Sequence, residues 1–178
     1  MALPLNFPSV ASELNLLALL SLMNFASGYR VPLHEATGRG AFDSIRAFIF
    51  SLYITSSIDS DDNLLSAGGM KKITEGRVAD LFGVADKIHT ERPHSEIPGV
   101  TVGELGGPIW ELVQLITKVM KETGTILVDG GYHDLGSFVL EALKEGEKAK
   151  ARSNGINPEC EVIVERVGVL LSFAAPQP

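Results

Sequence analysis

The feature that most constrains this chain is a short apolar run near its start, from Leu14 to Phe25. The run is shorter than the roughly 20 residues that cross a bilayer, and Asn15 and Asn24 interrupt it. Apolar side chains lie on most sides of the predicted helix, which is typical of a helix buried in a protein core. The run therefore predicts a central core helix and no membrane span.

The residues that follow predict the end of this helix. Gly28 and Pro32 are helix-breaking residues, and the next apolar helical spacing covers about 40–53. Between them lies a polar stretch that contains Arg30, His34 and Glu35. We expect this stretch to be a loop, which either connects two helices or lines a site.

Hydrophobic spacing predicts further helices. They cover Met70–Phe82, with a start at Thr74 and a stop at Gly83, a segment beginning at Pro108, Leu135–Lys150 and Glu159–Phe173. Residues 85–107 show no regular pattern, and Phe42 and Trp110 read as core aromatics. The fold class predicted is mainly α, with one helical domain at 1–166. A small, apolar tail follows at 167–178.

Composition and charge restrict the class of protein to which the chain can belong. The chain has 178 residues and is 45% hydrophobic, which fits a globular domain. Its formal net charge of −7 argues against a nucleic-acid backbone as a direct partner. Cys160 is the single cysteine, so neither an intrachain disulfide nor a cysteine zinc site is expected. No secretory signal is evident, and a cytoplasmic protein without metal or cofactor is predicted.

Few motifs indicate a catalytic or ligand-binding role, and each of these also has a purely structural interpretation. Neither a phosphate-binding Gly-x-x-x-x-Gly-Lys-Ser/Thr loop nor a Gly-x-Ser-x-Gly motif occurs. Gly38-Arg39-Gly40 before a helix could hold a phosphate, or simply start the helix. Phe25 could stack a base while Asn24 pairs with its edge, or it could pack inward.

Three carboxylates near predicted loops are candidates for a general base. They are Glu35, Asp129 and Asp134. Surface carboxylates are common, and the sequence alone selects none of them.

A set of short motifs resembles the queuosine salvage protein family. In order along the chain they are Leu22-Met-Asn-Phe25, Gly38-Arg-Gly-Ala-Phe-Asp-Ser-Ile45, Ile73-Thr-Glu-Gly-Arg-Val-Ala-Asp-Leu-Phe82, Met120-Lys-Glu-Thr-Gly-Thr-Ile-Leu127 and Gly136-Ser-Phe138. The similarity spans roughly residues 14–166. It implies a helical domain similar to helix-hairpin-helix DNA glycosylases, and an N-glycosidic bond hydrolase.

The resemblance implies a substrate and candidate site residues. Family members hydrolyse queuosine 5'-phosphate and release the base queuine, which is reused in transfer RNA. Such a reaction needs a carboxylate, an aromatic side chain for the base and donors for the phosphate. Asn24 and Phe25 would then lie near the base, and His34 or Arg39 would face the phosphate.

The chain departs from the family at its end. Family members are longer, and the aspartate assigned the transition-state role lies beyond the last residue of this chain. After Arg166 the sequence turns into the small, apolar tail. We therefore expect a fragment that is inactive, with its catalytic residue unassigned. The alternative is a non-catalytic helical interaction module; the sequence does not give the oligomeric state.

Overall fold

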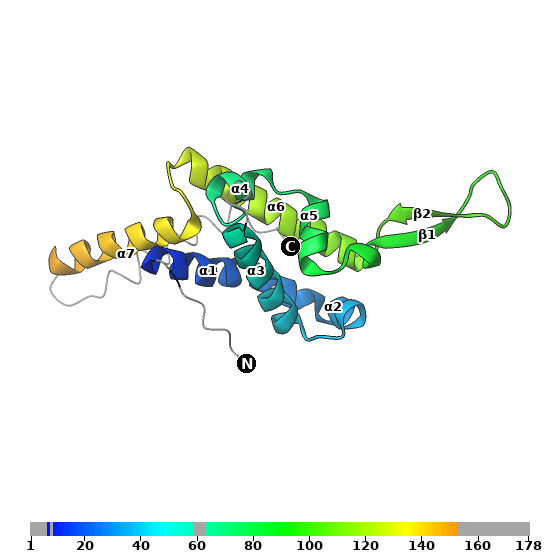
Figure 1. Ribbon diagram of the computed structural model, residues 1–178, viewed down its shortest axis with the longest axis horizontal. Coiled ribbons are helices and arrows are strands. Elements are labelled where there is room, and N and C mark those ends of the chain that lie inside the picture. Colours follow the sequence, from blue (N-terminus) through cyan, green and yellow to red (C-terminus); the bar gives the residue numbers. More distant parts are fainter. Residues whose placement is uncertain (1–6, 8, 59–62, 153–178) are drawn as a thin grey trace.

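The chain forms an elongated, mainly α-helical structure, as predicted (Figure 1). The computed structural model describes residues 7, 9–58 and 63–152. The helix α7 lies at one end of the molecule and a β-hairpin projects from the other. The elements are α1 (Val10–Leu22), the 3₁₀ helix η1 (Met23–Tyr29), α2 (Arg30–Thr37), α3 (Ala41–Ile58), α4 (Ala67–Lys72), α5 (Glu75–Phe82), the 3₁₀ helix η2 (Ala85–Lys87), β1 (His89–Pro93), β2 (Thr101–Leu105), α6 (Pro108–Asp129) and α7 (Leu135–Arg152).

The helix α6 is the long axis of the core. One of its sides is buried at the three-four spacing expected of an amphipathic helix, and α4, α5, η1 and α2 pack against it. The prediction that Pro108 begins this helix is confirmed, because proline lacks the N–H group that the first helical position leaves unpaired. Its buried residues include Ile109, Leu112, Val113, Ile116, Val119, Met120 and Leu127.

Two glycines set how closely the helices approach. A Cβ atom at Gly124 of α6 would lie 2.5 Å from the backbone N of Lys71 and 2.7 Å from the carbonyl O of Ala67, both in α4. A Cβ atom at Gly136 of α7 would overlap the carbonyl O of Ala11 in α1. Only glycine permits these backbone contacts, so the two positions fix α4 on α6 and α7 on α1.

A buried asparagine connects three segments. Asn15 of α1 is 4% exposed. Its Nδ2 donates to the Leu65 carbonyl at 3.1 Å, and its Oδ1 accepts from the Gly136 N–H at 3.1 Å. A buried amide needs such partners, because an unpaired one costs about 1–3 kcal/mol. Asn15 therefore holds the turn before α4 and the start of α7 on either side of α1.

The loop predicted after the first helix is wrong, because those residues are helical. The first α-helix ends at Leu22, and the chain continues as η1 and α2 to Thr37. Pro32 is the third residue of α2, where its missing N–H has no partner within the helix to lose. Gly38, with φ of 69°, ends α2 instead.

The predicted unit at Met70–Phe82 is two helices. Thr74 caps α5, and its Oγ1 accepts from the Arg77 N–H at 3.3 Å. Gly83 ends α5 with φ of 72°. Both of these boundaries were predicted correctly, but the break at Ile73 was missed.

The irregular stretch predicted at 85–107 is wrong in part, since it contains the antiparallel hairpin β1–β2. Every residue of both strands is exposed. Strands that bury neither face carry no apolar alternation, and this alternation is the signal that sequence reading depends on.

Of the two predicted core aromatics, one is placed correctly. Trp110 packs against the core, as predicted. Phe42 is 58% exposed, with the Arg46 guanidinium 5.9 Å from its ring centroid. The predicted helix at 159–173 and the tail at 167–178 lie outside the described residues.

The glycine contact between α6 and α4 gives a prediction about stability. Gly124→Ala places a methyl group against the α4 backbone, and we expect the free energy of unfolding to fall by about 1–3 kcal/mol. Gly76→Ala is the control, because Gly76 lies in α5 with nothing within 4 Å of the added Cβ. We expect that variant to gain up to about 1 kcal/mol. Urea denaturation of both variants measures the difference, and equal effects would contradict the contact.

The Asn15 contacts give a second prediction. Asn15→Ala leaves the Leu65 carbonyl and the Gly136 N–H without these partners, and we expect a loss of about 2–4 kcal/mol in the free energy of unfolding. Asn24→Ala serves as the control, because Asn24 is exposed and we expect a change within about 0.5 kcal/mol. Thermal and urea unfolding compare the two variants. A loss no greater for Asn15→Ala than for Asn24→Ala would argue against the bridging role.

Candidate functional site

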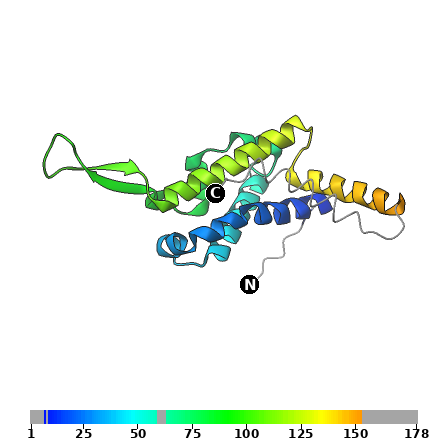
Figure 2. The same cartoon turned by 180° about the vertical axis from the view of Figure 1, so that it is seen from behind.

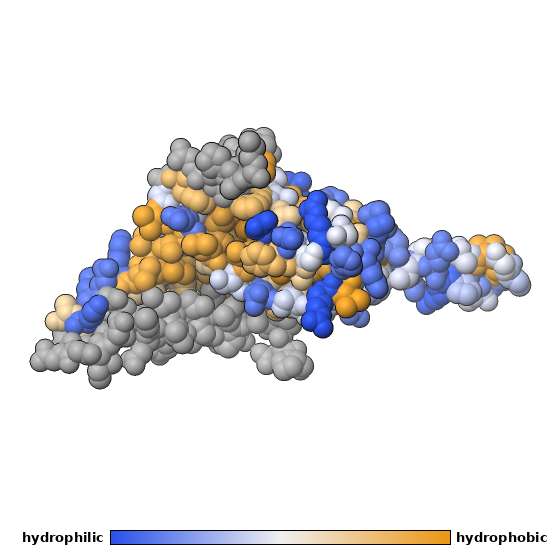
Figure 3. Space-filling model, turned by 90° about the horizontal axis from the view of Figure 1, so that it is seen from below, coloured by the Kyte–Doolittle hydropathy of each residue, from blue (hydrophilic) through white to orange (hydrophobic). Residues whose placement is uncertain are grey.

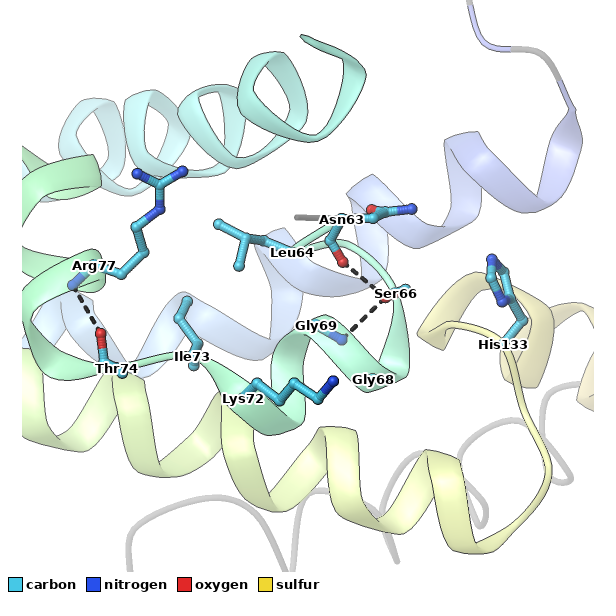
Figure 4. Close-up of a pocket in the computed structure, with 10 residues that line it drawn as sticks. All are labelled: Asn63, Leu64, Ser66, Gly68, Gly69, Lys72, Ile73, Thr74, Arg77 and His133. Atoms are coloured by element: carbon cyan, nitrogen blue, oxygen red, sulfur yellow. Dashed lines mark hydrogen bonds between the residues drawn. The ribbon is translucent and has the colours of Figure 1, made fainter. Parts of the chain in front are cut away.

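The candidate site is a cavity between the turn at 63–66, α4, the start of α5 and the segment before α7 (Figure 4). Its volume is about 580 Å³, which is within the usual range for small-molecule sites. It is lined by Asn63, Leu64, Ser66, Gly68, Gly69, Lys72, Ile73, Thr74, Arg77 and His133.

The turn that forms one wall is held by its own polar groups. Ser66 caps α4, where its Oγ accepts from the Gly69 N–H at 3.0 Å and donates to the Asn63 carbonyl at 2.7 Å. The N–H of Ala67 donates to the His133 carbonyl at 2.7 Å. A Cβ atom at Gly69 would overlap the Asn63 carbonyl. Only glycine therefore fits at position 69 in this turn. These contacts bring His133 to the cavity.

The charged lining residues, Lys72 and Arg77, are both basic, and the imidazole of His133 lies beside them. Lys72 comes from the end of α4, Arg77 from α5 and His133 from the segment between α6 and α7 (Figure 4). No carboxylate joins them among the lining residues that the structure describes, although the whole chain has a net charge of −7. The N-terminus of α5 also borders the cavity at Thr74, and its first N–H groups carry partial positive charge. The arrangement favours an anionic ligand.

A second hollow of about 410 Å³ adjoins the first. The two share Asn63, Ser66 and His133 in their linings. The second is lined mostly by hydroxyl, amide and imidazole groups, together with the carboxylate of Asp134. The buried Oγ of Ser56 lies here without a hydrogen-bond partner among the described residues. This hollow suits a polar, hydroxylated ligand group.

Asp134 has a structural contact as well. One carboxylate oxygen, Oδ1, accepts from the Ser137 N–H at 2.7 Å at the start of α7. The residue is half-buried, whereas Asp129 is exposed at the end of α6 and Glu35 is exposed on α2. Of the three carboxylates predicted as possible bases, Asp134 is therefore the one beside the candidate site.

Asn24 and Phe25, predicted as base-binding residues, lie on η1. The Asn24 side chain is exposed, and Phe25 is half-buried against the hydrophobic core. Neither residue lines the 580 Å³ cavity or the hollow beside it. The inward packing of Phe25 matches the plainer of its two interpretations, and the predicted contact with a base stays a prediction.

His34 and Arg39, predicted to face a phosphate, are both exposed. His34 lies on α2. Arg39 lines two smaller hollows at the start of α3, of about 280 and 540 Å³. Among the described residues, no side-chain hydrogen bond or ion pair joins either of them to Asn24 or Phe25. The structure therefore does not gather the four predicted residues into one described cavity.

The charges around Arg39 are largely paired. Asp43 forms an ion pair with Arg46 at 3.4 Å. The hydrogen bond from Lys87, with an Nζ–Oδ2 distance of 3.1 Å, lowers the pKa of Asp86 below its usual value. Lys72, by contrast, has no ion pair among the described residues. The larger cavity is therefore the better anion site of the two regions.

Sequence reasoning missed Lys72, Arg77 and His133, because they come from three separate segments. One signal was available. Thr74 was predicted as a helix start, and a helix start followed closely by a basic residue is a common anion-binding arrangement. The contribution of His133 depends on tertiary contacts that no local pattern contains.

Two further features of the described residues concern metal binding and membrane insertion. In the part of the chain that the structure describes, no three His, Cys, Asp or Glu side chains are placed to hold a metal ion. The continuous helical stretch Val10–Thr37 is long and apolar enough to cross a membrane by length and composition. Core helices of soluble proteins and signal sequences pass the same test; 28% of the apolar window is buried, and Leu19, Met23, Ala26 and Leu33 of this stretch are fully buried.

Comparison with known proteins leaves the chain without an assigned family. No protein-family model, curated protein or solved structure matches it.

Tyr29 supports a prediction about alkaline pH. Partial burial on η1, and secondarily the Glu111 carboxylate on α6, raise the pKa of Tyr29 above its usual value of 10.0. The folded state therefore holds this proton more tightly than the unfolded state. This contribution to the free energy of unfolding is complete below pH 10 and is lost as the pH rises through the folded pKa.

We expect Tyr29→Phe to lose less stability than the wild type between pH 9 and pH 11, relative to each protein at pH 8. Urea unfolding across this range measures it; Tyr53→Phe is the control, and parallel curves for Tyr29→Phe and wild type would refute the effect.

Proposed function

We propose that this chain binds a nucleoside 5'-monophosphate of the queuosine type and belongs to the queuosine salvage N-glycosidases. The observation that carries the proposal is the 580 Å³ cavity whose charged lining residues are all basic, in a chain of net charge −7. The motifs quoted above supply the choice of substrate, and the mainly helical fold is compatible with the helix-hairpin-helix glycosylase type of domain. Queuosine 5'-phosphate is the substrate, and queuine is the product.

In this proposal the phosphate occupies the basic cavity. Lys72 and Arg77 lie on its wall beside the α5 N-terminus, and charged donors form the stronger hydrogen bonds to phosphate oxygens. The sugar then lies toward the adjoining hollow, where Asn63, Ser66 and the unpaired Ser56 hydroxyl provide polar groups. The lining residue His133, which the two hollows share, supports one continuous site for both parts of the ligand.

Hydrolysis of the N-glycosidic bond makes a sugar with oxocarbenium character, which a nearby carboxylate stabilises. Water attacks the anomeric carbon, the C–N bond breaks and the base leaves with a proton. Asp134 is the one carboxylate that lines either hollow among the described residues. The family resemblance instead gives this role to an aspartate beyond residue 178, so the two possibilities predict different behaviour of the isolated chain.

The binding part of the proposal is tested with neighbouring lysines. Both lysines are exposed, but Lys72 lines the cavity and the adjacent Lys71 does not. We expect Lys72→Gln to weaken binding of queuosine 5'-monophosphate about tenfold or more, because a charged contact to phosphate is lost. Lys71→Gln keeps the same net charge as Lys72→Gln, and we expect it to bind as the wild type does. Isothermal titration calorimetry measures both, and equal affinities would contradict the cavity assignment.

Chemistry is tested separately from binding. The purified chain is incubated with queuosine 5'-monophosphate, and queuine release is followed by chromatography. Release that Asp134→Asn abolishes and Asp129→Asn leaves intact would assign the carboxylate to Asp134. Binding without release would show that this chain binds the nucleotide but that none of its carboxylates performs the hydrolysis. A folded chain that neither binds nor releases would refute the proposal.

A non-catalytic interaction module is the second candidate function. The observation that favours it is the projecting hairpin, where Ile97, Val100, Val102 and Leu105 are each more than 40% exposed. The hairpin and the cavity lie in different parts of the molecule, so the two functions do not exclude each other.

A further inference from the structure

The hairpin projects away from the helical body. From the front and from behind, β1 and β2 extend beyond the first turn of α6 (Figures 1 and 2). The space-filling view shows them as a narrow extension with hydrophobic residues near its far end (Figure 3). Each strand pairs with the other and has no comparable contact with any described helix. An isolated two-stranded hairpin is of marginal stability in water. Pairing with a further strand would therefore stabilise this extension.

The hydrogen-bond pattern shows which backbone groups point outward. The Gly106 N–H donates to the Ile88 carbonyl at 2.9 Å, and the His94 N–H donates to the Val100 carbonyl at 2.8 Å. Between these two pairs the antiparallel register is continuous. Hydrogen-bonded and non-hydrogen-bonded pairs alternate in such a ladder. The outward-facing backbone groups therefore belong to His89, Glu91 and Pro93 of β1, and to Thr101, Gly103 and Leu105 of β2.

The two edges of the hairpin differ in their capacity to pair. On β1, Pro93 has no N–H to donate, and Glu91 adds a charge. Proline and charged residues are common means of protecting an edge strand. On β2, all three outward-facing residues have both an N–H and a carbonyl, and the one charged residue of the strand, Glu104, pairs with Arg92. The β2 edge is therefore open, and the β1 edge is closed.

We propose that the β2 edge binds the β2 edge of a second copy of this chain, in an antiparallel arrangement centred on Gly103. In this register Gly103 lies opposite Gly103 of the second copy, and Thr101 lies opposite Leu105 of the second copy. Every outward-facing group of one edge meets an outward-facing group of the other. The product is a four-stranded sheet in the order β1–β2–β2–β1.

The side chains fit this register. Gly103 lies on the two-fold axis, where its N–H and carbonyl both bond to those of Gly103 in the second copy. Val102 lies opposite Glu104 of the second copy, so the two Glu104 carboxylates are not directly opposed. Within each hairpin, Arg92 already pairs with Glu104 at 3.5 Å. A register centred on Thr101 or Leu105 leaves part of each edge unpaired, so the Gly103 register makes the most hydrogen bonds.

The test uses two proline variants that are matched across the ladder. Glu91 and Gly103 are direct partners in the register, and the N–H of each points outward, so neither substitution removes a bond between β1 and β2. Light scattering after size-exclusion chromatography measures the mass over a range of concentrations. We expect the wild type and Glu91→Pro to approach twice the 19.1 kDa of one chain as concentration rises. We expect Gly103→Pro to remain a monomer.

Two mass results would overturn the proposal. One is a wild-type chain that stays monomeric at every concentration. The other is a Gly103→Pro variant that forms dimers as readily as the wild type, since dimers would then form through another surface.

Hydrogen exchange of the wild type tests the same edge without any substitution. We expect the amides of Thr101, Gly103 and Leu105 to exchange quickly in dilute solution and to become at least tenfold slower at concentrations where the mass doubles. The Glu91 amide on the opposite edge is the control and should stay fast. Doubling of the mass without slower exchange on β2 would refute the pairing, even if the proline variants disturb the hairpin itself.

Discussion

The arrangement of the cavity depends on one buried side chain, Asn15. Its amide group holds the Leu65 carbonyl on one side and the Gly136 N–H on the other. These two segments carry the turn that precedes α4 and the residues that precede α7, and their side chains meet at the cavity. A polar residue in the middle of an apolar helix thus serves as the connection between parts of the chain that are far apart in sequence. The same residue is one of the interruptions in the apolar run at the start of the chain.

The helix boundaries that were predicted correctly from the sequence are those set by a residue at the boundary itself. Pro108 begins α6, while Thr74 and Gly83 enclose α5, and all three act within a few residues of their own position. The prediction was wrong around Pro32, because a proline in the first turn of a helix is tolerated and a proline further along is not. Sequence position alone did not distinguish the two cases.

The candidate site was less predictable than the fold. Lys72, Arg77 and His133 are ordinary surface residue types, and their meeting depends on Gly124 and Asn15. The hairpin was missed for a different reason. Its strands bury neither face, so they have no alternating pattern, and the backbone edge that distinguishes β1 from β2 is defined only by the register.

The position of α7 has a consequence for how the protein opens. Among the described helices α7 packs mainly along α1, so its release from the body would expose α1 in particular. Such partial unfolding has a lower free energy than global unfolding in most proteins. Detachment would also release the Gly136 N–H from Asn15 and free the segment that carries His133. Because His133 lines the cavity, a ligand that occupies the cavity would then favour the state in which α7 is docked.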